Sequence, residues 1–337
     1  MIGFRIDANE YVATGHMMRC MAIALACMKA GACCIFYLAE NKYTDRLDEA
    51  GINYKIIDSK WNDLEYETEK LCKLVKEDNI EWLVVDSYYV TNRYLSKVNE
   101  VCNVMYVDDL SEEIYNVSAM LHYYPWNCEQ YKKKYESIGV ETLVGCRYVP
   151  LRDEFINLSE TDKRDRSILF TSGGTDPYNV TMSFLNYIEQ SRDISKFDIY
   201  IIVGNMNIYE KEIRDFAKDK RNIHILKNIN NMSYYMKKCS YAVSACVTTL
   251  FELCACKIPT VCFSFADNQL ELTKNMHEDN IMLYAGDVRN ISDIGHAIMQ
   301  KLILYLEDKT LKEKSVQNME ALVDGKGADR IAKFLLQ

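Results

Sequence analysis

The hydrophobic positions of this chain form short apolar runs, and longer stretches with a helical pattern lie between them. Residues 82–86 are a near-continuous apolar run that ends in an acid, and residues 104–109 repeat the pattern. Such runs are typical of strands that are buried on both faces, as in a parallel sheet. Between them, residues 64–77 carry apolar side chains at helical spacing. The pattern therefore predicts strands and helices in alternation.

Read along the whole chain, the same signals predict two α/β runs. In the first half we expect strands at 2–6, 33–38, 53–57, 82–86, 104–109 and 119–124, and helices at 21–30, 44–50 and 64–77. In the second half we expect strands at 167–171, 198–203, 222–226, 241–244 and 259–265, and helices at 231–238, 248–256, 291–307, 309–323 and 328–336. Alternation of this kind indicates parallel sheets.

A polar stretch divides the two runs. Residues 157–166 are rich in polar and charged side chains, which is typical of a linker. We therefore predict two Rossmann-like domains, an N-terminal one at 1–155 and a C-terminal one at 156–337, with parallel sheets facing a cleft. A length of 337 residues suits two domains of ordinary size.

Composition and charge narrow the class of protein. The net charge of −9 argues against a nucleic-acid binder, which usually carries a basic face. The 13 cysteines are odd in number and include no C-x-x-C, so we expect reduced thiols in a cytoplasmic protein rather than a disulfide framework or a metal site. The longest apolar segment, 21–39, is divided by Lys29 and Gly31, and we expect no secretory signal and no membrane span.

The most informative stretch is Ala13 to Cys20, which follows the first strand and opens the first helix. It contains Gly15 and His16. Ligands of open α/β sheets bind beyond the carboxyl ends of the strands, and helix N-termini favour phosphate or a developing oxyanion. His16 is thus a candidate catalytic residue, and Gly15 would allow a ligand to approach the backbone. The alternative is a histidine that only caps or packs.

Three of the predicted strands finish at acids, Asp7, Asp86 and Asp108. The carboxyl ends of parallel strands share one edge of a domain, so these side chains are expected at the same edge. For Asp86 and Asp108, considered one at a time, we favour a role in capping the next helix or loop.

The second half offers its own set of turns between a strand and a helix. They hold Ser172 to Thr175, Ala245 to Thr249 with Glu252, and Asp267 to Gln269. Taken alone, Thr249 and Glu252 fit a capping box better than a ligand site. Taken together, small and hydroxyl residues at helix starts suit a diphosphate, and Glu252 could accept hydrogen bonds from a ribose diol.

Several of these segments resemble the PseG family of UDP-sugar hydrolases. The resemblance runs from about residue 4 to about residue 275 and is most specific at its two ends. It rests on 5–7 with 15–20, 86–88, 108–109, 151–155, 172–176 and 266–269. It implies a GT-B fold similar to that of MurG, and a reaction that removes UDP from UDP-2,4-diacetamido-2,4,6-trideoxy-β-L-altrose with inversion, in pseudaminic acid biosynthesis.

By the same resemblance, His16 would activate the attacking water and the C-terminal domain would bind UDP. A neutral imidazole is a competent base near neutral pH, and we expect no metal and no cofactor. The predicted substrate-binding residues are Asp7, Gly15, Arg19, Tyr88, Gly173, Gly174, Ile225, Ser244, Thr248, Thr249, Glu252, Asn268 and Gln269.

One loop departs from the common pattern of the family. Many members carry glycines where this chain has Ala245, Cys246 and Val247, whose side chains could crowd a phosphate. Two alternatives to the hydrolase therefore stay open: a GT-B glycosyltransferase that uses a UDP-sugar donor, and a nucleotide-sugar-binding protein without catalysis. We expect a cytoplasmic monomer whose partner is the small-molecule UDP-sugar.

Overall fold

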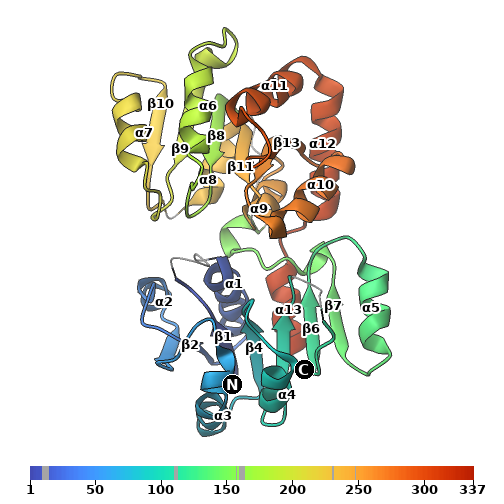
Figure 1. The fold of residues 1–337 in the computed structure, drawn as a ribbon. Helices are drawn as coiled ribbons and strands as arrows, with labels where there is room; N and C mark the ends of the chain where they lie inside the picture. The colour runs from blue at the N-terminus through green and yellow to red at the C-terminus, as the bar shows by residue number, and fades with distance from the viewer. Residues whose placement is uncertain (10–14, 110–112, 157, 159–163, 230, 247) are drawn as a thin grey trace. The chain divides into compact units, whose positions relative to one another are not determined.

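The computed structural model describes residues 1–9, 15–109, 113–156, 158, 164–229, 231–246 and 248–337. Ala13 and Thr14 of the opening motif, Val247, and residues 157 and 159–163 of the predicted linker lie outside this set. The chain divides into two compact units, one made of 1–153 with 325–337 and the other of 154–324 (Figure 1). Each unit is an α/β layer structure on a parallel sheet, so the predicted fold class is confirmed.

The first unit is built on a seven-stranded parallel sheet in the order β3-β2-β1-β4-β5-β6-β7. Its strands are β1 (Ile2–Ile6), β2 (Cys34–Leu38), β3 (Asn53–Ile56), β4 (Trp82–Asp86), β5 (Asn103–Val107), β6 (Ala119–His122) and β7 (Glu141–Val144). Its helices are α1 (Gly15–Lys29), α2 (Asp45–Glu49), α3 (Thr68–Glu77), α4 (Asn92–Asn99), α5 (Cys128–Glu136) and α13 (Gly327–Leu335), with short 3₁₀ turns η1 (Leu64–Glu67) and η2 (Cys146–Tyr148).

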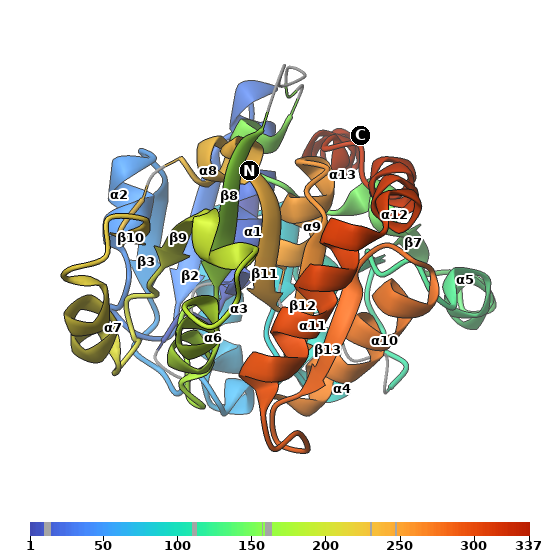
Figure 2. The ribbon, with the colours of Figure 1, turned by 90° about the horizontal axis from the view of Figure 1, so that it is seen from above.

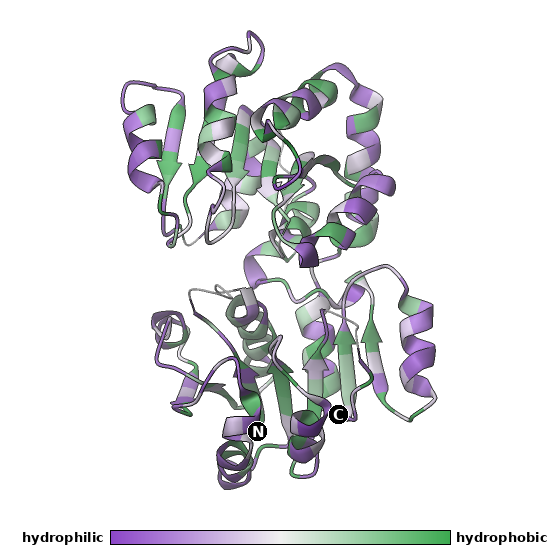
Figure 3. Ribbon diagram, in the orientation of Figure 1, coloured by the Kyte–Doolittle hydropathy of each residue, from purple (hydrophilic) through white to green (hydrophobic). Residues whose placement is uncertain are grey.

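Apolar side chains are buried on both faces of this sheet, which explains why most of its strands are continuous apolar runs. Figure 3 shows the central strands in the colour of hydrophobic residues. Leu83 and Val85 of β4 belong to a core shared with α3, α4 and α5. Phe4 of β1 is fully buried and stacks on Phe36 of β2, with ring centroids 4.9 Å apart. Alternate residues of a strand point to opposite faces, so each strand contributes to two cores.

The last helix belongs to the first unit, which corrects the expected C-terminal domain of 156–337. Helix α13 packs on α1, and its Phe334 ring lies 5.4 Å from that of Trp82 in β4. Arg330 donates a hydrogen bond to the Arg147 carbonyl at 2.8 Å. The apolar spacing of α13 predicted a helix, but spacing alone does not say which core a helix covers.

Gly327 allows the close approach of α13 to η2. A Cβ atom at this position would lie 2.0 Å from the Val149 carbonyl oxygen, which is backbone and cannot rotate away. We expect Gly327→Ala to lower the free energy of unfolding by about 1–3 kcal/mol. Urea unfolding would measure this, with the exposed Lys333→Ala as the control expected to change it by less than about 0.5 kcal/mol. Equal effects of the two substitutions would contradict the packing argument.

The second unit has a six-stranded parallel sheet in the order β10-β9-β8-β11-β12-β13. Its strands are β8 (Asp165–Thr171), β9 (Asp198–Ile202), β10 (Ile223–Leu226), β11 (Cys239–Ala245), β12 (Thr260–Ser264) and β13 (Leu283–Asp287). Its helices are α6 (Val180–Ile188), α7 (Glu210–Ala217), α8 (Met232–Lys238), α9 (Thr249–Ala255), α10 (Leu270–Glu278), α11 (Ile294–Glu307) and α12 (Lys309–Leu322). The 3₁₀ turns η4 (Ile194–Lys196) and η5 (Asp267–Gln269) complete it, and η3 (Asp153–Phe155) lies at the division of the units.

One face of this second sheet is covered by α6, α7 and α11 around a core that includes Phe170 and Phe263. Helices α6 and α11 pack side by side, as Figure 2 also shows. Gly295 permits this contact, because a Cβ atom there would lie 2.3 Å from the Ser183 carbonyl oxygen.

Both sheets reverse their strand order at one point. In the first unit β1 lies between β2 and β4, and in the second β8 lies between β9 and β11. After β1 the chain continues to one side of the sheet, and after β4 it continues to the other. The same holds for β8 and β11. Such a reversal opens a crevice at the carboxyl ends of the two strands. These two switch points are where ligands of such folds bind. In the described part of the chain, no helix is both long and apolar enough to span a bilayer.

Candidate functional site

His16 lies at the switch point of the first unit. It is the second residue of α1, the helix that follows β1, and Asp86 ends the neighbouring strand β4. Its Nδ1 atom is 3.0 Å from Asp86 Oδ1 and 3.1 Å from the Asp86 backbone oxygen. The fold therefore joins two residues 70 positions apart because their strands are neighbours.

The other ring nitrogen of His16 has no partner among the described groups. The residue is 4% exposed, and its Nε2 is buried and makes no hydrogen bond to the described protein atoms. Asp86 offers only acceptors to Nδ1, so the proton of the neutral ring belongs on Nδ1 and the lone pair on Nε2. This tautomer has a free basic nitrogen, which is what a general base needs.

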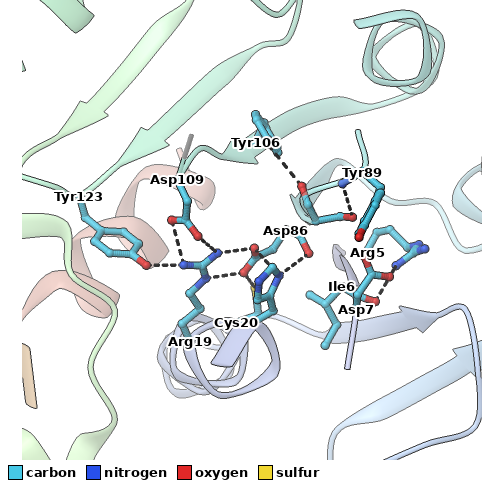
Figure 4. A network of polar contacts seen from close by, with 12 residues as sticks. Arg5, Ile6, Asp7, Arg19, Cys20, Asp86, Tyr89, Tyr106, Asp109 and Tyr123 are labelled. Atoms are coloured by element: carbon cyan, nitrogen blue, oxygen red, sulfur yellow. Dashed lines mark hydrogen bonds and ion pairs between the residues drawn. The ribbon is translucent and has the colours of Figure 1, made fainter. Parts of the chain in front are cut away.

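Arg19, one turn further along α1, holds Asp86 from the other side. Its Nε donates to Asp86 Oδ2 at 2.6 Å and its Nη2 to Oδ1 at 2.5 Å. The same guanidinium donates to both carboxylate oxygens of Asp109, at 3.0 and 2.8 Å, and to the Tyr123 hydroxyl. Figure 4 shows Arg19 between the two carboxylates. Two parallel hydrogen bonds fix the plane of each carboxylate as well as its position.

Tyr88 closes the arrangement around the imidazole. Its ring meets the His16 ring edge-on, with centroids 4.6 Å apart and planes at 88°. Burial first, and then the charge of Asp109, to which its hydroxyl hydrogen-bonds, raise the pKa of Tyr88, so that it stays neutral at neutral pH. His16, Asp86, Arg19, Asp109 and Tyr88 thus form a closed ring of contacts.

The charges of this cluster act on His16 in opposite directions. Burial by itself lowers the pKa of His16, but the charge of Asp86 and the hydrogen bond to it raise that pKa, and the net result lies above 6.5. Burial by itself raises the pKa of Asp86, but Arg19 first and His16 second hold it well below its usual range. Asp86 is therefore ionised whenever the protein is folded near neutral pH.

Asp86 does not cap a helix, and our expectation for it was wrong. The next helix, α4, is capped by Thr91, whose hydroxyl oxygen accepts from the Tyr94 amide at 3.0 Å. The carboxylate of Asp86 is bound by Arg19 and His16 instead. Asp108, the other strand-end acid, accepts a hydrogen bond from the Tyr131 hydroxyl at 2.7 Å.

Asp7 belongs to a second buried cluster. Its carboxylate accepts from Arg5 Nη1 at 2.6 Å, and Arg5 also binds Glu67, with Nε 2.5 Å from Oε1 and Nη2 3.0 Å from Oε2. Tyr94 and Ser59 donate to Glu67 as well. Asp7 thus lies at the predicted edge of the sheet, with its charge balanced inside the protein.

Gly15, also predicted to bind substrate, opens α1. A Cβ atom at this position would meet no described atom within 4 Å. Packing against the described residues therefore does not require glycine here, and its role in binding stays a prediction.

Predicted residues of the second unit gather at its own switch point. Gly173 and Gly174 follow β8, and Thr171 of that strand is the register partner of Ser244 in β11. Thr248 and Thr249 follow β11 and are partly exposed. Ser244 is fully buried and its hydroxyl donates to the Ala245 carbonyl at 2.9 Å, so that side chain is already engaged.

The structure does not show the capping box that Thr249 and Glu252 could form. A capping box needs its threonine at the N-cap, but the N-cap of α9 is Thr248, and the Thr248 side chain makes no capping hydrogen bond. Glu252 lies in the first turn of α9 and is partly exposed. Its role in ribose binding stays a prediction.

The remaining predicted residues lie in η5, beyond β12, and in the edge strand β10. Asn268 is exposed in η5, after β12, and Gln269 is buried beside it. The Gln269 side-chain oxygen accepts from the Phe265 amide at 2.8 Å and so braces its own loop. Ile225, in β10, is partly exposed and lies two strands from β8.

Asp86, Asp109 and Tyr123 were not among our predicted site residues. A signal for two of them was present, because acids at successive strand ends mark one edge of a parallel sheet. Tyr123 follows β6, a strand that does not end in an acid. Its contact with Arg19 is apparent only in the structure.

Comparison with known proteins supports the fold. No family model matches the chain. An uncharacterized protein of Methanocaldococcus jannaschii, MJ1062, is 24% identical over 290 residues, which are 81% of this chain and 56% of that protein. The spore coat polysaccharide biosynthesis protein SpsG of Bacillus subtilis is 23% identical over 181 residues, 52% of this chain and 51% of SpsG. The chain therefore spans about half the length of the curated relatives it matches.

Solved structures resemble the whole chain at low identity. Acinetobacter baumannii MurG has a TM-score of 0.68 at 12% identity and 99% coverage of both chains. The Streptomyces glycosyltransferase SsfS6, complexed with thymidine diphosphate, gives 0.66 at 12% identity and full coverage of both chains. Anabaena HepE in complex with UDP gives 0.60 at 13% identity, also over both full chains. The chain thus has the two-domain parallel α/β fold of GT-B proteins.

Proposed function

We propose that this protein is an enzyme that acts on a nucleotide sugar and uses His16 as its general base. One observation carries the proposal: His16 is buried at a switch point, with Nδ1 bound by Asp86 and Nε2 without a described partner. A histidine that only packed would be expected to use both nitrogens, since buried polar atoms are normally hydrogen-bonded.

The reaction that we propose is inverting hydrolysis of a UDP-sugar. His16 Nε2 takes a proton from a water molecule as the water oxygen attacks the anomeric carbon. The bond between that carbon and the phosphate oxygen breaks, and its electron pair leaves with UDP. A positioned base of this kind contributes about 10²–10⁴-fold to a rate.

The second unit would bind the nucleotide. The proposal places the phosphates near Gly173, Gly174 and Thr248, and the ribose at Glu252. Support comes from the clustering of these positions at the carboxyl ends of β8 and β11, the neighbouring strands of that switch point. The complexes of SsfS6 with thymidine diphosphate and of HepE with UDP point the same way.

Resemblance to the PseG family suggests the sugar, 2,4-diacetamido-2,4,6-trideoxy-L-altrose, and a place in pseudaminic acid biosynthesis. The test is incubation with the corresponding UDP-sugar in H₂¹⁸O, without any acceptor. We expect UDP and a free sugar that carries ¹⁸O at its anomeric carbon. Label on UDP instead would mean attack at phosphorus and would contradict the mechanism.

A glycosyltransferase is the second candidate, because SsfS6 and the forosaminyltransferase SpnP share the fold. The same base would then deprotonate a hydroxyl of an acceptor sugar. Release of UDP that depends on an added acceptor would favour the transferase. UDP binding without turnover under either condition would favour a binding protein, which is the third alternative.

Glu252 offers a test of the nucleotide site. We expect Glu252→Gln to weaken UDP binding by up to about tenfold, since one charged hydrogen-bond acceptor is lost. The melting temperature should stay nearly unchanged if Glu252 serves the ligand, because glutamine keeps the size and the packing of the side chain. Calorimetry and thermal melts would measure both. Lost stability with unchanged affinity would instead show that Glu252 is structural.

A further inference from the structure

Arg19 was predicted to bind substrate, but the contacts of its guanidinium point to another role. An arginine side chain has five N–H donors. Five donor–acceptor contacts join Arg19 to Asp86, Asp109 and the Tyr123 hydroxyl. The side chain is 6% exposed and Asp86 and Asp109 are both ion-paired with it. No donor is left over for a substrate phosphate or hydroxyl.

We propose that Arg19 is a positioning residue that holds Asp86 against His16 and sets the charge around the imidazole, with Asp109 as its second carboxylate. The proposal rests on the proposed role of His16 as the base. Neither Arg19 nor Asp109 makes a described hydrogen bond to His16, so both act on it through Asp86, Tyr88 and the local field.

The charge of the cluster explains the direction of the effect. With neutral His16, the two carboxylates and one guanidinium carry a net charge of about −1, and protonation of His16 brings the cluster close to zero. Arg19 lowers the pKa of His16 through its charge, whereas Asp109 raises it. Removal of either charge should thus move the titration of His16, and the two removals should move it in opposite directions.

The other titratable groups around His16 stay neutral near neutral pH. These groups are Tyr88 after β4, Cys20 on α1 and Tyr123 after β6. Burial is the largest cause of the raised pKa of each. Among the described residues, the charges that face His16 from α1, β4 and the turn after β5 are therefore those of Arg19, Asp86 and Asp109.

The experiment measures the titration of His16 itself by ¹⁵N NMR of the full-length protein, without substrate. The chain has five histidines, and the His16→Asn variant assigns the His16 signals. We expect the midpoint to fall by about one pH unit in Asp109→Asn and to rise by a similar amount in Arg19→Gln. Tyr123→Phe removes a neutral hydrogen bond and should leave the midpoint in place.

The Arg19→Lys variant distinguishes a positioning role from substrate binding. It also keeps the proposal testable if Arg19→Gln fails to fold. Lysine keeps the charge but cannot bind two carboxylates in parallel pairs. We expect the midpoint to stay near its wild-type value, while kcat falls by up to about 100-fold and KM hardly changes. A raised KM with unchanged kcat would show that Arg19 binds substrate, and would overturn the proposal.

These readouts distinguish the proposal from the proposed function. If the protein has no turnover on any UDP-sugar but the midpoints still move in opposite directions, Arg19 tunes His16 and only the assigned activity is wrong. If the midpoints do not move in Asp109→Asn and Arg19→Gln, the positioning role is wrong, whatever the activity.

Discussion

His16→Asn should abolish most turnover and leave nucleotide binding intact. Asparagine keeps a polar group of similar reach but has no nitrogen that can take up a proton near neutral pH. We expect kcat on the UDP-sugar to fall by about 10²–10⁴-fold. The affinity for UDP should persist, because the proposed nucleotide residues belong to the second unit. Steady-state kinetics and calorimetry with UDP would measure both quantities.

The wild-type pH profile is the companion test. Only neutral His16 can accept a proton, and its pKa in the free protein is raised above 6.5 by Asp86, despite the opposing effect of burial. The profile of kcat/KM should therefore lose activity as the pH falls, with its acid limb centred above pH 6.5. A His16→Asn enzyme with wild-type kcat would exclude His16 as the base.

Asp86→Asn should be almost as damaging, although Asp86 need not touch the substrate. Among the described residues, Arg19 Nε donates only to Asp86, whereas Arg19 Nη2 also has Asp109 as an acceptor. The side-chain oxygen of the asparagine is therefore expected to accept from Arg19 Nε. In that orientation of the amide, the new NH₂ group faces His16. That group donates to Nδ1 in place of the contact between Nδ1 and the residue 86 backbone oxygen at 3.1 Å, so the ring proton moves to Nε2 and the base is lost.

For this variant we expect kcat to fall by about 10²–10⁴-fold, the effect of a wrong histidine tautomer. The ¹⁵N shifts of His16 report the tautomer directly. The double variant with His16→Asn should be no worse than His16→Asn alone, because the two residues act as a unit.

Glu67→Gln is the matched control. Like Asp86, Glu67 is a buried carboxylate whose two oxygens both accept from an arginine of the same unit. Its arginine is Arg5, however, and Glu67 makes no described contact with His16. Its replacement should cost stability without changing kcat. An equal loss of kcat in both variants would mean that Asp86→Asn acts through folding and not through the tautomer.

The strands of both units were largely readable from the sequence, because buried parallel strands are continuous apolar runs. Strands β7 and β13 were missed. Strand β7 is short and partly exposed at the edge of its sheet. Strand β13 contains Gly286, which has a positive φ of 125° and lies next to a register shift. Helices α4, α7 and α10 were also missed. For α4, the N-cap Thr91 and the apolar residues of its buried face were present in the sequence.

The site was predictable only in part. His16 could be singled out because it follows the first strand at a helix start, next to Gly15, in a stretch that resembles the PseG family. The role of Asp86 could not, since it depends on β4 lying next to β1, and strand order is a property of the whole sheet. The hydrogen bonds of Arg19 could not be predicted either, because its acceptors lie 67, 90 and 104 positions away along the chain.

Helix α13 has a consequence for the synthesis of the protein. The first unit contains residues 1–153 and 325–337, so the whole second unit is translated between its two parts. At roughly 5–20 residues per second, the ribosome needs on the order of ten to thirty seconds for that interval. During this time α1 and Trp82 lack the cover of α13. We therefore expect the nascent first unit to be a target for a chaperone that binds apolar surface until α13 has been synthesised.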